Sequence, residues 1–253
     1  MPSREYRVGG ERILRSFYVF RTTARMTWVK ICGMTNLEDT LTAVEAGADA
    51  VGFVFYEKSS RCVSVEVARE IVGKLPESVE KVGVFVGGSA EQVTRSSERA
   101  GLSAVQVYPS PGKGPGSVTD LVQHVRRRMF VAIPGQRVTS EEGFGFFFSE
   151  DFLKCTSAVF LDSGDSHQPG GTGKAFNWGI AAEPVKRMGK IVPVVIAGGL
   201  TSENVAEAIG ILKPWGVDVA SGVEARPGKK DPEKVWAFVK AVREAERSNG
   251  SGG

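Results

Sequence analysis

Two short apolar segments each end in a side chain that could move a proton. Residues 28–31 are followed by Cys32, and residues 158–161 are followed by Asp162. Because side chains alternate along a strand, Lys30 would point to the same face as Cys32, and a nearby cation favours the thiolate over the thiol, whose ordinary pKa is about 8.5. A carboxyl group among apolar residues is favoured in its protonated form and can serve as a general acid. The pair predicts acid-base chemistry, whereas the alternatives are an inert, packed Cys32 and an Asp162 that caps a helix or forms an ion pair.

Two glycine-rich turns indicate a phosphate site. Glycine lets the backbone approach a ligand closely, and helix N-termini present unpaired amide donors. Two such turns in neighbouring loops favour a phosphorylated ligand over plain turns. The residues concerned are Gly198 and Gly199 in the first turn, and Ser221 and Gly222 in the second. A further loop, residues 163–175, contains Gly173 in a glycine-rich stretch that suggests a lid over a ligand, and it does not match a P-loop.

Two more charged residues are candidates for contacts with a ligand. Arg61 lies in a polar loop, where it could bind a second anionic group such as a carboxylate, although simple exposure to solvent is the commoner role. Asp218 lies within an apolar segment, residues 217–219, and would be a buried acid. An ion pair with an inward lysine explains Asp218 as well as a substrate contact does.

The composition excludes several classes of protein. Apolar residues make up 42% of the 253 and charged residues 24%, as in ordinary globular domains. The chain has two histidines, which argues against histidine-rich metal sites and against Ser-His-Asp catalysis. Its three cysteines are widely spaced, which favours a reducing compartment and hence the cytoplasm. No stretch approaches the about 18 apolar residues of a membrane span.

The positive charge is confined to one end of the chain. Residues 1–25 carry six arginines and two glutamates (net +4), so that the remaining 228 residues carry a net charge of −1. A near-neutral body argues against a partner that is a nucleic acid. We expect residues 1–25 to lie outside the fold, as a disordered extension, as translation from a start upstream of Met26, or as a targeting or interaction arm. The tail, residues 248–253, has the composition of a flexible linker.

One pattern is repeated eight times between these ends: an apolar strand, a polar or glycine-rich turn, and a helix. Eight such units over 220 residues predict one closed (β/α)8 barrel, residues 26–247. The expected strands are residues 28–31, 50–55, 81–86, 104–107, 130–133, 158–161, 192–197 and 217–220. Expected helix starts are capping boxes at Thr35 with Glu38 and at Ser89 with Gln92, and N-caps at Ser64 and Thr201.

Two parts of the pattern are irregular. Residues 109–117 are almost entirely proline, glycine and serine, and we expect a mobile loop after the fourth strand, because a domain linker here would leave two open half-barrels. In the fifth unit, phenylalanines at 144 and 146–148 do not fit a helical period. In a barrel of this kind the loops after the strands meet on one face, so the candidate residues above would lie together there.

Taken together, these residues resemble the phosphoribosylanthranilate isomerase family, barrel enzymes of tryptophan synthesis. The resemblance extends over all eight units, about residues 27–243. The matching stretches are residues 29–33 with 36–39, 47–55, 60–61, 82–86, 104–106, 161–162, 170–173 with 176 and 178, 197–200, 217–218, 221–225 and 227–231.

The resemblance implies an Amadori rearrangement of N-(5-phosphoribosyl)anthranilate, without a metal or a redox cofactor. The acid matching Asp162 protonates the ring oxygen, and the thiolate matching Cys32 removes the adjacent carbon-bound proton. It further implies substrate contacts from Lys30, Arg61, Gln106 and Asp218, and phosphate binding by Gly173, Gly198, Gly199, Ser221 and Gly222. The partner would be this small phosphoribosyl molecule, bound by a monomer or a homodimer.

The chain departs from the family pattern in places. Where members have Leu-His-Gly after the glutamine matching Gln106, this chain has Val107, Tyr108 and Pro109, and Tyr108 would face inward. Asn177 stands in place of Asp and Ala220 in place of Ser. The alternatives are the related isomerase of histidine synthesis, which uses two carboxylates where this chain has Cys32 and Asp162, and a phosphosugar-binding barrel without catalysis.

Overall fold

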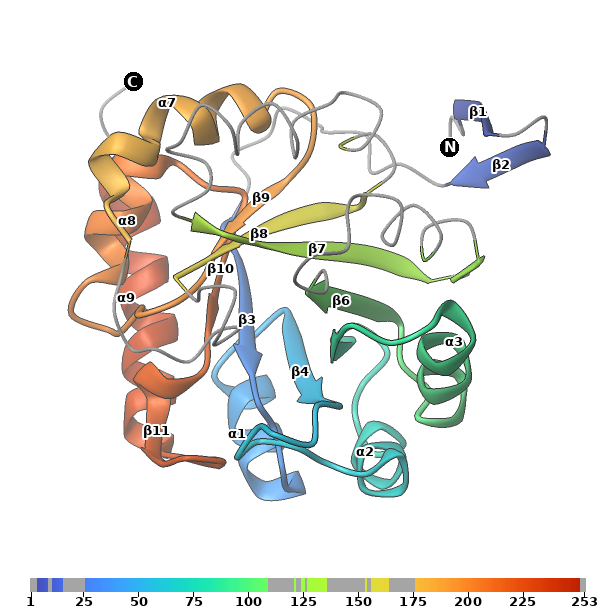
Figure 1. Ribbon diagram of the computed structural model, residues 1–253. Coiled ribbons are helices and arrows are strands. Elements are labelled where there is room, and N and C mark those ends of the chain that lie inside the picture. Colours follow the sequence, from blue (N-terminus) through green and yellow to red (C-terminus); the bar gives the residue numbers. More distant parts are fainter. Residues whose placement is uncertain are drawn as a thin grey trace.

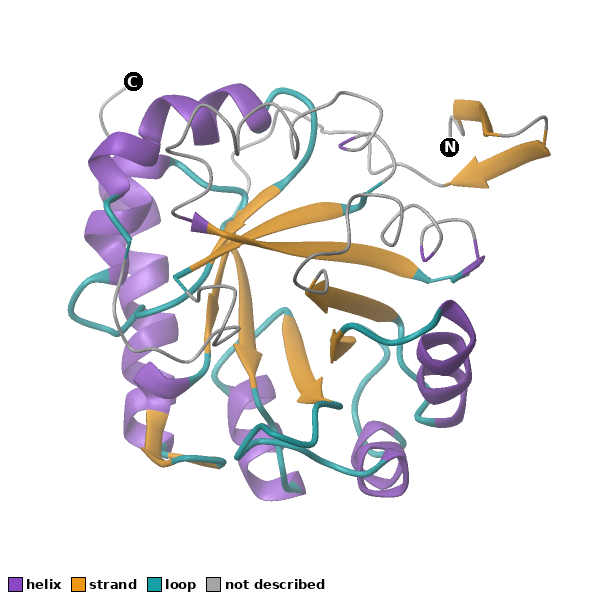
Figure 2. Cartoon of the chain, in the orientation of Figure 1, coloured by secondary structure: helices purple, strands orange, loops and turns teal. Residues whose placement is uncertain are grey.

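Eight parallel strands close into a barrel, which confirms the predicted architecture. The structure is a computed structural model that describes residues 26–108, 121, 124, 125, 127–135, 153, 156–163 and 176–250, and the backbone of 4–8 and 11–15. Around the barrel the strands follow the order β10-β3-β4-β5-β6-β7-β8-β9 (Figures 1 and 2). They are β3 (Trp28–Cys32), β4 (Ala50–Val54), β5 (Glu80–Val86), β6 (Ala104–Tyr108), β7 (Arg128–Pro134), β8 (Ala158–Asp162), β9 (Val194–Ile196) and β10 (Gly216–Val219). All eight predicted strands are therefore present, with ends shifted by at most two residues.

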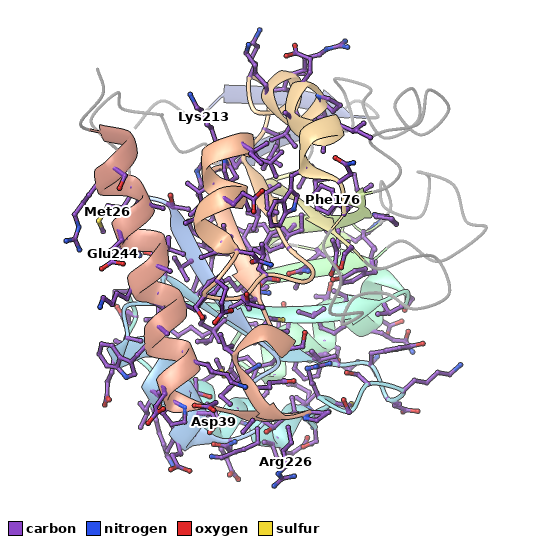
Figure 3. The ribbon with its side chains drawn as sticks, turned by 90° about the vertical axis from the view of Figure 1, so that its left-hand side faces the viewer. Met26, Asp39, Phe176, Lys213, Arg226 and Glu244 are labelled. Carbon is purple, nitrogen blue, oxygen red and sulfur yellow. The ribbon has the colours of Figure 1, made fainter. Side chains whose placement is uncertain are left out.

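Helices lie outside the ring of strands (Figure 2). The described helices are α1 (Leu37–Glu45), α2 (Val65–Val72), α3 (Ala90–Arg99), α7 (Trp178–Met188), α8 (Val205–Leu212) and α9 (Pro232–Gly250). Their apolar faces pack on the outward side chains of the strands in one continuous core. In Figure 3, Asp39 at the start of α1 and Arg226 lie at one end of the molecule, and Lys213 at the end of α8 lies at the other. The first of these ends is where the strands finish.

Two of the four predicted helix starts are correct. Ser89 and Gln92 form the capping box of α3, and the Ser64 hydroxyl accepts a hydrogen bond from the amide of Val67 at the start of α2. The predicted box at Thr35 is wrong, because the neighbouring residue Asn36 caps α1 through the amide of Asp39.

Thr201 is not an N-cap either. Its backbone carbonyl accepts a hydrogen bond from the amide of Val205, and a turn over residues 201–204 precedes α8, which begins only at Val205. Asn204 stabilises this turn, because its side chain accepts from the Thr201 amide and donates to the carbonyl of Gly199. The polar residues in this segment therefore shape the loop after β9 instead of starting the helix.

The barrel interior is built in layers. The lowest layer is apolar and aromatic, and contains Trp28, Ala50, Val82, Ala104, Phe130, Ala132, Ala158, Phe160 and Val195. Above it lie three buried polar residues. Lys30 and Gln106 each come two positions after a residue of the lowest layer, Trp28 and Ala104, and Asp218 is the register partner of Lys30. Cys32, Val54 and Val84 lie nearest the mouth. Alternation along the strands thus carries polar side chains from the sealed base to the open end.

Several segments lie outside the barrel. Strands β1 (Arg4–Val8) and β2 (Glu11–Arg15) pair antiparallel in a separate two-stranded sheet, a hairpin that the sequence analysis did not predict. A second small sheet pairs β11 (Glu224–Arg226) with β12 (Lys229–Lys230). Helix α9 continues to Gly250, three residues into the expected flexible tail.

The two irregular parts noted in the sequence, residues 109–117 and the phenylalanines at 144–148, lie outside the described residues. The same holds for Gly173 and most of the loop over residues 163–175. Within the part of the chain that the structure covers, no helix combines the length and apolar character that a membrane span requires.

Candidate active site

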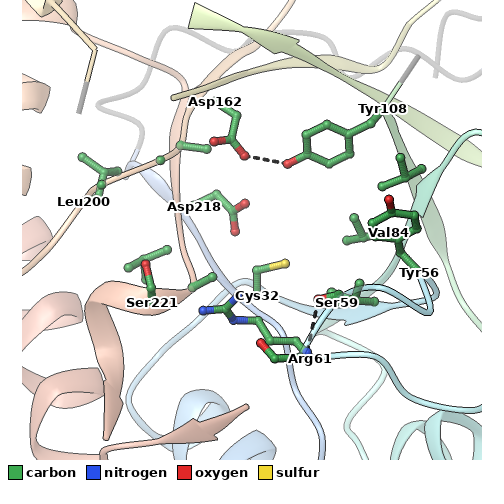
Figure 4. Close-up of a pocket in the computed structure, with 18 of the residues that line it drawn as sticks. Cys32, Tyr56, Ser59, Arg61, Val84, Tyr108, Asp162, Leu200, Asp218 and Ser221 are labelled. Carbon is green, nitrogen blue, oxygen red and sulfur yellow. Dashed lines mark hydrogen bonds between the residues drawn. The ribbon is translucent and has the colours of Figure 1, made fainter. Parts of the chain in front are cut away.

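A cavity of about 420 Å³ opens at the carboxyl ends of the strands (Figure 4). Seven of the residues predicted for the site line it: Cys32, Arg61, Asp162, Gly198, Gly199, Asp218 and Ser221. Three others, Lys30, Gln106 and Gly222, do not line it, and Gly173 lies outside the described residues. The remaining lining residues are Val54, Tyr56, Lys58, Ser59, Ser60, Val84, Val86, Tyr108, Ala197, Leu200, Val219 and Ala220.

Cys32 lies at the end of β3, with its sulfur directed into the cavity (Figure 4). Lys30 is fully buried below it on the same face of the strand. Gly52 on the neighbouring strand makes room for both, since a Cβ there would lie 2.8 Å from Cys32 Sγ and 3.1 Å from Lys30 Nζ. The predicted placement of lysine and cysteine on one face is therefore correct.

The expected effect of Lys30 on the thiol is only partly correct. Burial raises the pKa of Cys32, and although Lys30 and Lys230 act in the opposite direction, the pKa remains above its ordinary value. The charge of Lys30 is partly cancelled by Asp218, which itself raises the pKa of Cys32. Burial therefore outweighs the cations around Cys32 and favours its thiol form.

Lys30 and Asp218 form a buried ion pair. Lys30 Nζ donates to Asp218 Oδ1 at 3.0 Å, and the two residues are register partners on β3 and β10. Burial lowers the pKa of Lys30, but Asp218 and Cys32 outweigh it and the pKa is raised. Burial also raises the pKa of Asp218, against the effect of Lys30. Of the two explanations for Asp218, the ion pair is present, and the carboxylate also reaches the cavity wall.

Asp162 projects into the cavity from the end of β8, opposite Cys32, with Asp218 between them (Figure 4). Tyr108, from the end of β6, donates a hydrogen bond from its hydroxyl to Asp162 Oδ2 at 2.6 Å. The inward orientation of Tyr108 follows from strand alternation and was predicted. Its hydrogen bond with Asp162 was not predicted. The two residues end β6 and β8, which are separated along the chain by β7, and the local sequence does not show that their side chains meet.

Arg61 contacts the cavity but its guanidinium group also has a partner in the protein. Nε and Nη2 donate to the two carboxylate oxygens of Glu224, at 2.8 and 2.7 Å. Lys230 Nζ donates to the same carboxylate at 3.1 Å and to the carbonyl of Ala220 at 3.0 Å. Burial opposes the charge on Glu224, yet Arg61 and Lys230 outweigh burial and lower its pKa. The sequence analysis gave Glu224 and Lys230 no role, although both lie in stretches that carry the family resemblance.

Residues of the two glycine-rich turns form another part of the cavity wall. Gly198 and Gly199 have φ of +78° and +67°, a backbone conformation that favours glycine. Gly222 lies behind this wall, because a Cβ there would be 1.9 Å from the carbonyl oxygen of Leu200. Ser221 begins a short 3-10 helix, η2 (Ser221–Val223), on the cavity side. The described residues of these turns that line the cavity, 197–200 with Ala220 and Ser221, carry no cationic side chain.

A thiol, two carboxyl groups and glycine turns at the mouth of a parallel barrel define a class: phosphate-binding (β/α)8 enzymes that catalyse proton transfer. The family model for N-(5'-phosphoribosyl)anthranilate isomerase matches residues 29–241. The chain belongs to this family, and it is an isomerase.

Individual relatives agree with the family model. The N-(5'-phosphoribosyl)anthranilate isomerase of Citrifermentans bemidjiense is 45% identical over 214 residues, which cover 85% of this chain and 96% of the relative. That of Geotalea uraniireducens is 42% identical over 218 residues, covering 86% and 99%. The crystal structure of the Thermotoga maritima enzyme has a TM-score of 0.74 and 36% identity, covering 87% of this chain and all of that one. A further structure of such an enzyme, in complex with reduced 1-(o-carboxyphenylamino)-1-deoxyribulose 5-phosphate, has a TM-score of 0.72, 36% identity and the same coverage.

Proposed function

We propose that this isomerase of tryptophan biosynthesis rearranges N-(5-phosphoribosyl)anthranilate with Asp162 as general acid and Cys32 as general base. The observation that carries the proposal is that both side chains enter one cavity from opposite sides, beside two glycine turns suited to a phosphate. A relative of the same fold has been solved with a reduced form of the expected product. The substrate is thus a small phosphorylated molecule.

The reaction divides into two proton transfers. Asp162 gives its proton to the ring oxygen, the bond from that oxygen to the anomeric carbon breaks, and the nitrogen lone pair forms an iminium ion. Cys32 acts from its thiolate form, the fraction of the enzyme that has given its thiol proton to solvent, and removes the proton from the neighbouring carbon. The electron pair of that C–H bond neutralises the nitrogen. The resulting enolamine becomes the ketone as its hydroxyl group loses a proton and the former anomeric carbon gains one. The overall change is an isomerisation, and no external oxidant or reductant is needed.

The charges around Cys32 bear on its role as the base. Burial raises the pKa of the Cys32 thiol, whereas Lys30 and Lys230 act in the opposite direction and favour the thiolate. An iminium ion beside the sulfur adds a further positive charge with the same effect. Removal of the neighbouring carbon-bound proton is therefore favoured after the ring has opened, when that proton has also become acidic.

The two anionic ends of the substrate are assigned to different parts of the cavity wall. We place the phosphate against Gly198, Gly199 and Ser221, because backbone amides can surround its oxygens there. We place the anthranilate carboxylate beside Arg61, whose guanidinium group carries further donors besides the two that contact Glu224. Val54 and Val84 offer apolar surface to the aromatic ring.

Lys30 and Gln106 are assigned indirect roles in place of the predicted contacts with substrate. Lys30 holds Asp218 and acts on the Cys32 sulfur from beneath. Gln106 is buried and donates to the hydroxyl of Tyr108 at 3.4 Å. The proposal uses one copy of the lining residues named above and applies to a monomer or a homodimer alike. A free thiol is kept reduced most readily in the cytosol, which supports a cytoplasmic location.

The test is to mix the purified chain with enzymatically generated N-(5-phosphoribosyl)anthranilate and to follow the loss of anthranilate-type fluorescence. Cys32→Ala and Asp162→Asn should each lower kcat by about 10²- to 10⁴-fold, as expected for loss of a general base or acid. Cys62→Ala, at the exposed cysteine, is the control and should leave kcat unchanged. Wild-type rates in both cavity variants would refute the roles assigned here. If the chain converts only the aminoaldose of histidine synthesis, or neither molecule, the proposed identity of the substrate is refuted.

A further inference from the structure

Tyr108 is placed to control the acid of the proposed reaction. Its hydroxyl group lies 2.6 Å from Asp162 Oδ2, and its ring packs against the apolar cluster of Cys32, Val54 and Val84 at the cavity mouth. The ring is thus held on one side by packing and at its tip by the carboxyl group. Tyrosine at this position is one of the points where the chain departs from the family pattern.

The direction of the hydrogen bond is fixed by a third residue. Gln106, two positions earlier on the same face of β6, donates from Nε2 to the Tyr108 oxygen. Because a tyrosine hydroxyl has a single hydrogen, and its oxygen already accepts from Gln106, that hydrogen is directed to Asp162. Burial and the nearby Asp162 charge raise the pKa of Tyr108 well above its ordinary value, so the hydroxyl keeps its proton.

This direction matters for the chemistry of the acid. With Tyr108 donating to Oδ2, a proton on the carboxyl group is carried by Oδ1. As that proton passes to the substrate, negative charge spreads over both oxygens, and the hydrogen bond at Oδ2 becomes a charge-assisted one. The bond is therefore stronger after proton transfer than before it, and an interaction that strengthens along the reaction lowers the barrier.

We infer that Tyr108 is a positioning residue for Asp162: its hydroxyl group orients the carboxyl group and stabilises the carboxylate that forms when the substrate ring opens. The inference rests on the proposed role of Asp162 as the acid. Gln106 supports it from beneath by fixing the direction of the Tyr108 hydroxyl.

Tyr108→Phe removes the hydroxyl group and keeps the ring. We expect kcat to fall about ten- to a hundredfold, as for loss of a hydrogen bond to a charged group, with KM changed less than about twofold. Tyr108→His, which can donate again from a ring nitrogen, should recover part of kcat.

A double-mutant cycle separates this role from simple packing. In the Asp162→Asn background, Tyr108→Phe should lower the residual rate no further, because its effect passes through the carboxylate. An equal loss in both backgrounds, or a Tyr108→Phe enzyme with wild-type kcat, would overturn the inference. If Asp162→Asn is inactive, either of these results refutes the role of Tyr108 and leaves the proposed function intact. An Asp162→Asn enzyme of wild-type kcat would instead refute the proposed function.

Discussion

Arg61 and Glu224 form a two-point contact across the cavity rim, with Nε 2.8 Å from Oε1 and Nη2 2.7 Å from Oε2. The contact joins the loop after β4 to β11, although the two residues are 163 positions apart. It holds the guanidinium plane in one orientation before substrate arrives. A fixed fork of donors suits a planar carboxylate, and less ordering is then needed on binding.

Arg61→Ala should raise KM about tenfold or more with kcat within about threefold, because the lost interaction is the same before and during the reaction. Glu224→Gln should raise KM by less, since the guanidinium group stays but loses its orientation. Steady-state kinetics measure both. Arg99→Ala, which breaks an exposed pair with Glu66, is the control and should leave KM unchanged. An unchanged KM in Arg61→Ala would show that the anthranilate carboxylate is bound elsewhere.

Lys30→Met should destabilise the fold by about 3–5 kcal/mol, because it leaves the Asp218 carboxylate buried without its partner. The pKa of Asp218 is already raised by burial, so in this variant the group gains a proton more readily. The loss should accordingly be smaller at pH 4 than at pH 8, where the unpaired charge must be kept. Urea unfolding at both pH values measures this.

The control for that experiment is Lys186→Met, at an exposed lysine, which should change stability by less than about 0.5 kcal/mol. Adding Asp218→Asn to Lys30→Met should recover part of the loss by removing the charge. A Lys30→Met loss that is the same at both pH values would contradict the account.

Alkylation of Cys32 should be slow at neutral pH. Its pKa is raised above the ordinary value, chiefly by burial, and only the thiolate reacts, so the rate with iodoacetamide should keep rising above about pH 8.5. Lys30→Met removes a cation that lowers the pKa and should slow the reaction further. Peptide-resolved mass spectrometry measures labelling at Cys32 separately from the other cysteines. Labelling that reaches its plateau below pH 8 would show that Cys32 is a thiolate in the empty site.

Gly222→Ala should weaken phosphate binding without touching the ligand. A Cβ at this position would lie 1.9 Å from the Leu200 carbonyl oxygen, so the two turns must move apart. We expect inorganic phosphate to inhibit this variant at least about tenfold less strongly, with a higher KM. Gly210→Ala is the matched control, because nothing lies within 4 Å of a Cβ there, and its helix should gain up to about 1 kcal/mol. Equal inhibition of both variants would place the phosphate elsewhere.

Much of the barrel could be predicted because a parallel strand buried on both faces is apolar along its whole length. Cys32 and Asp162 stood out for the same reason, as reactive groups at the ends of such strands. Strand alternation gave the shared face of Lys30 and Cys32, since it depends only on local geometry.

What the sequence did not predict depends on contacts between distant segments. Nothing local pairs Tyr108 with Asp162, or Arg61 with Glu224. The charge state of Cys32 was expected to follow its cationic neighbour, but burial outweighs the effect of Lys30. The predicted cap at Thr35 failed because two adjacent residues, Thr35 and Asn36, both suit the role and only the path of the chain selects between them.

The Lys30–Asp218 pair joins the first and last strands of the barrel, where the ring closes. During synthesis on a ribosome, Lys30 emerges long before Asp218, so a nascent or truncated chain ending before β10 contains half of this pair and lacks the cavity residues Asp218, Val219, Ala220 and Ser221. The cavity around the Lys30–Asp218 pair therefore cannot form until the last strand has been synthesised. Activity should arise in a single step, when the last strand docks, and partially digested protein should lose it just as abruptly.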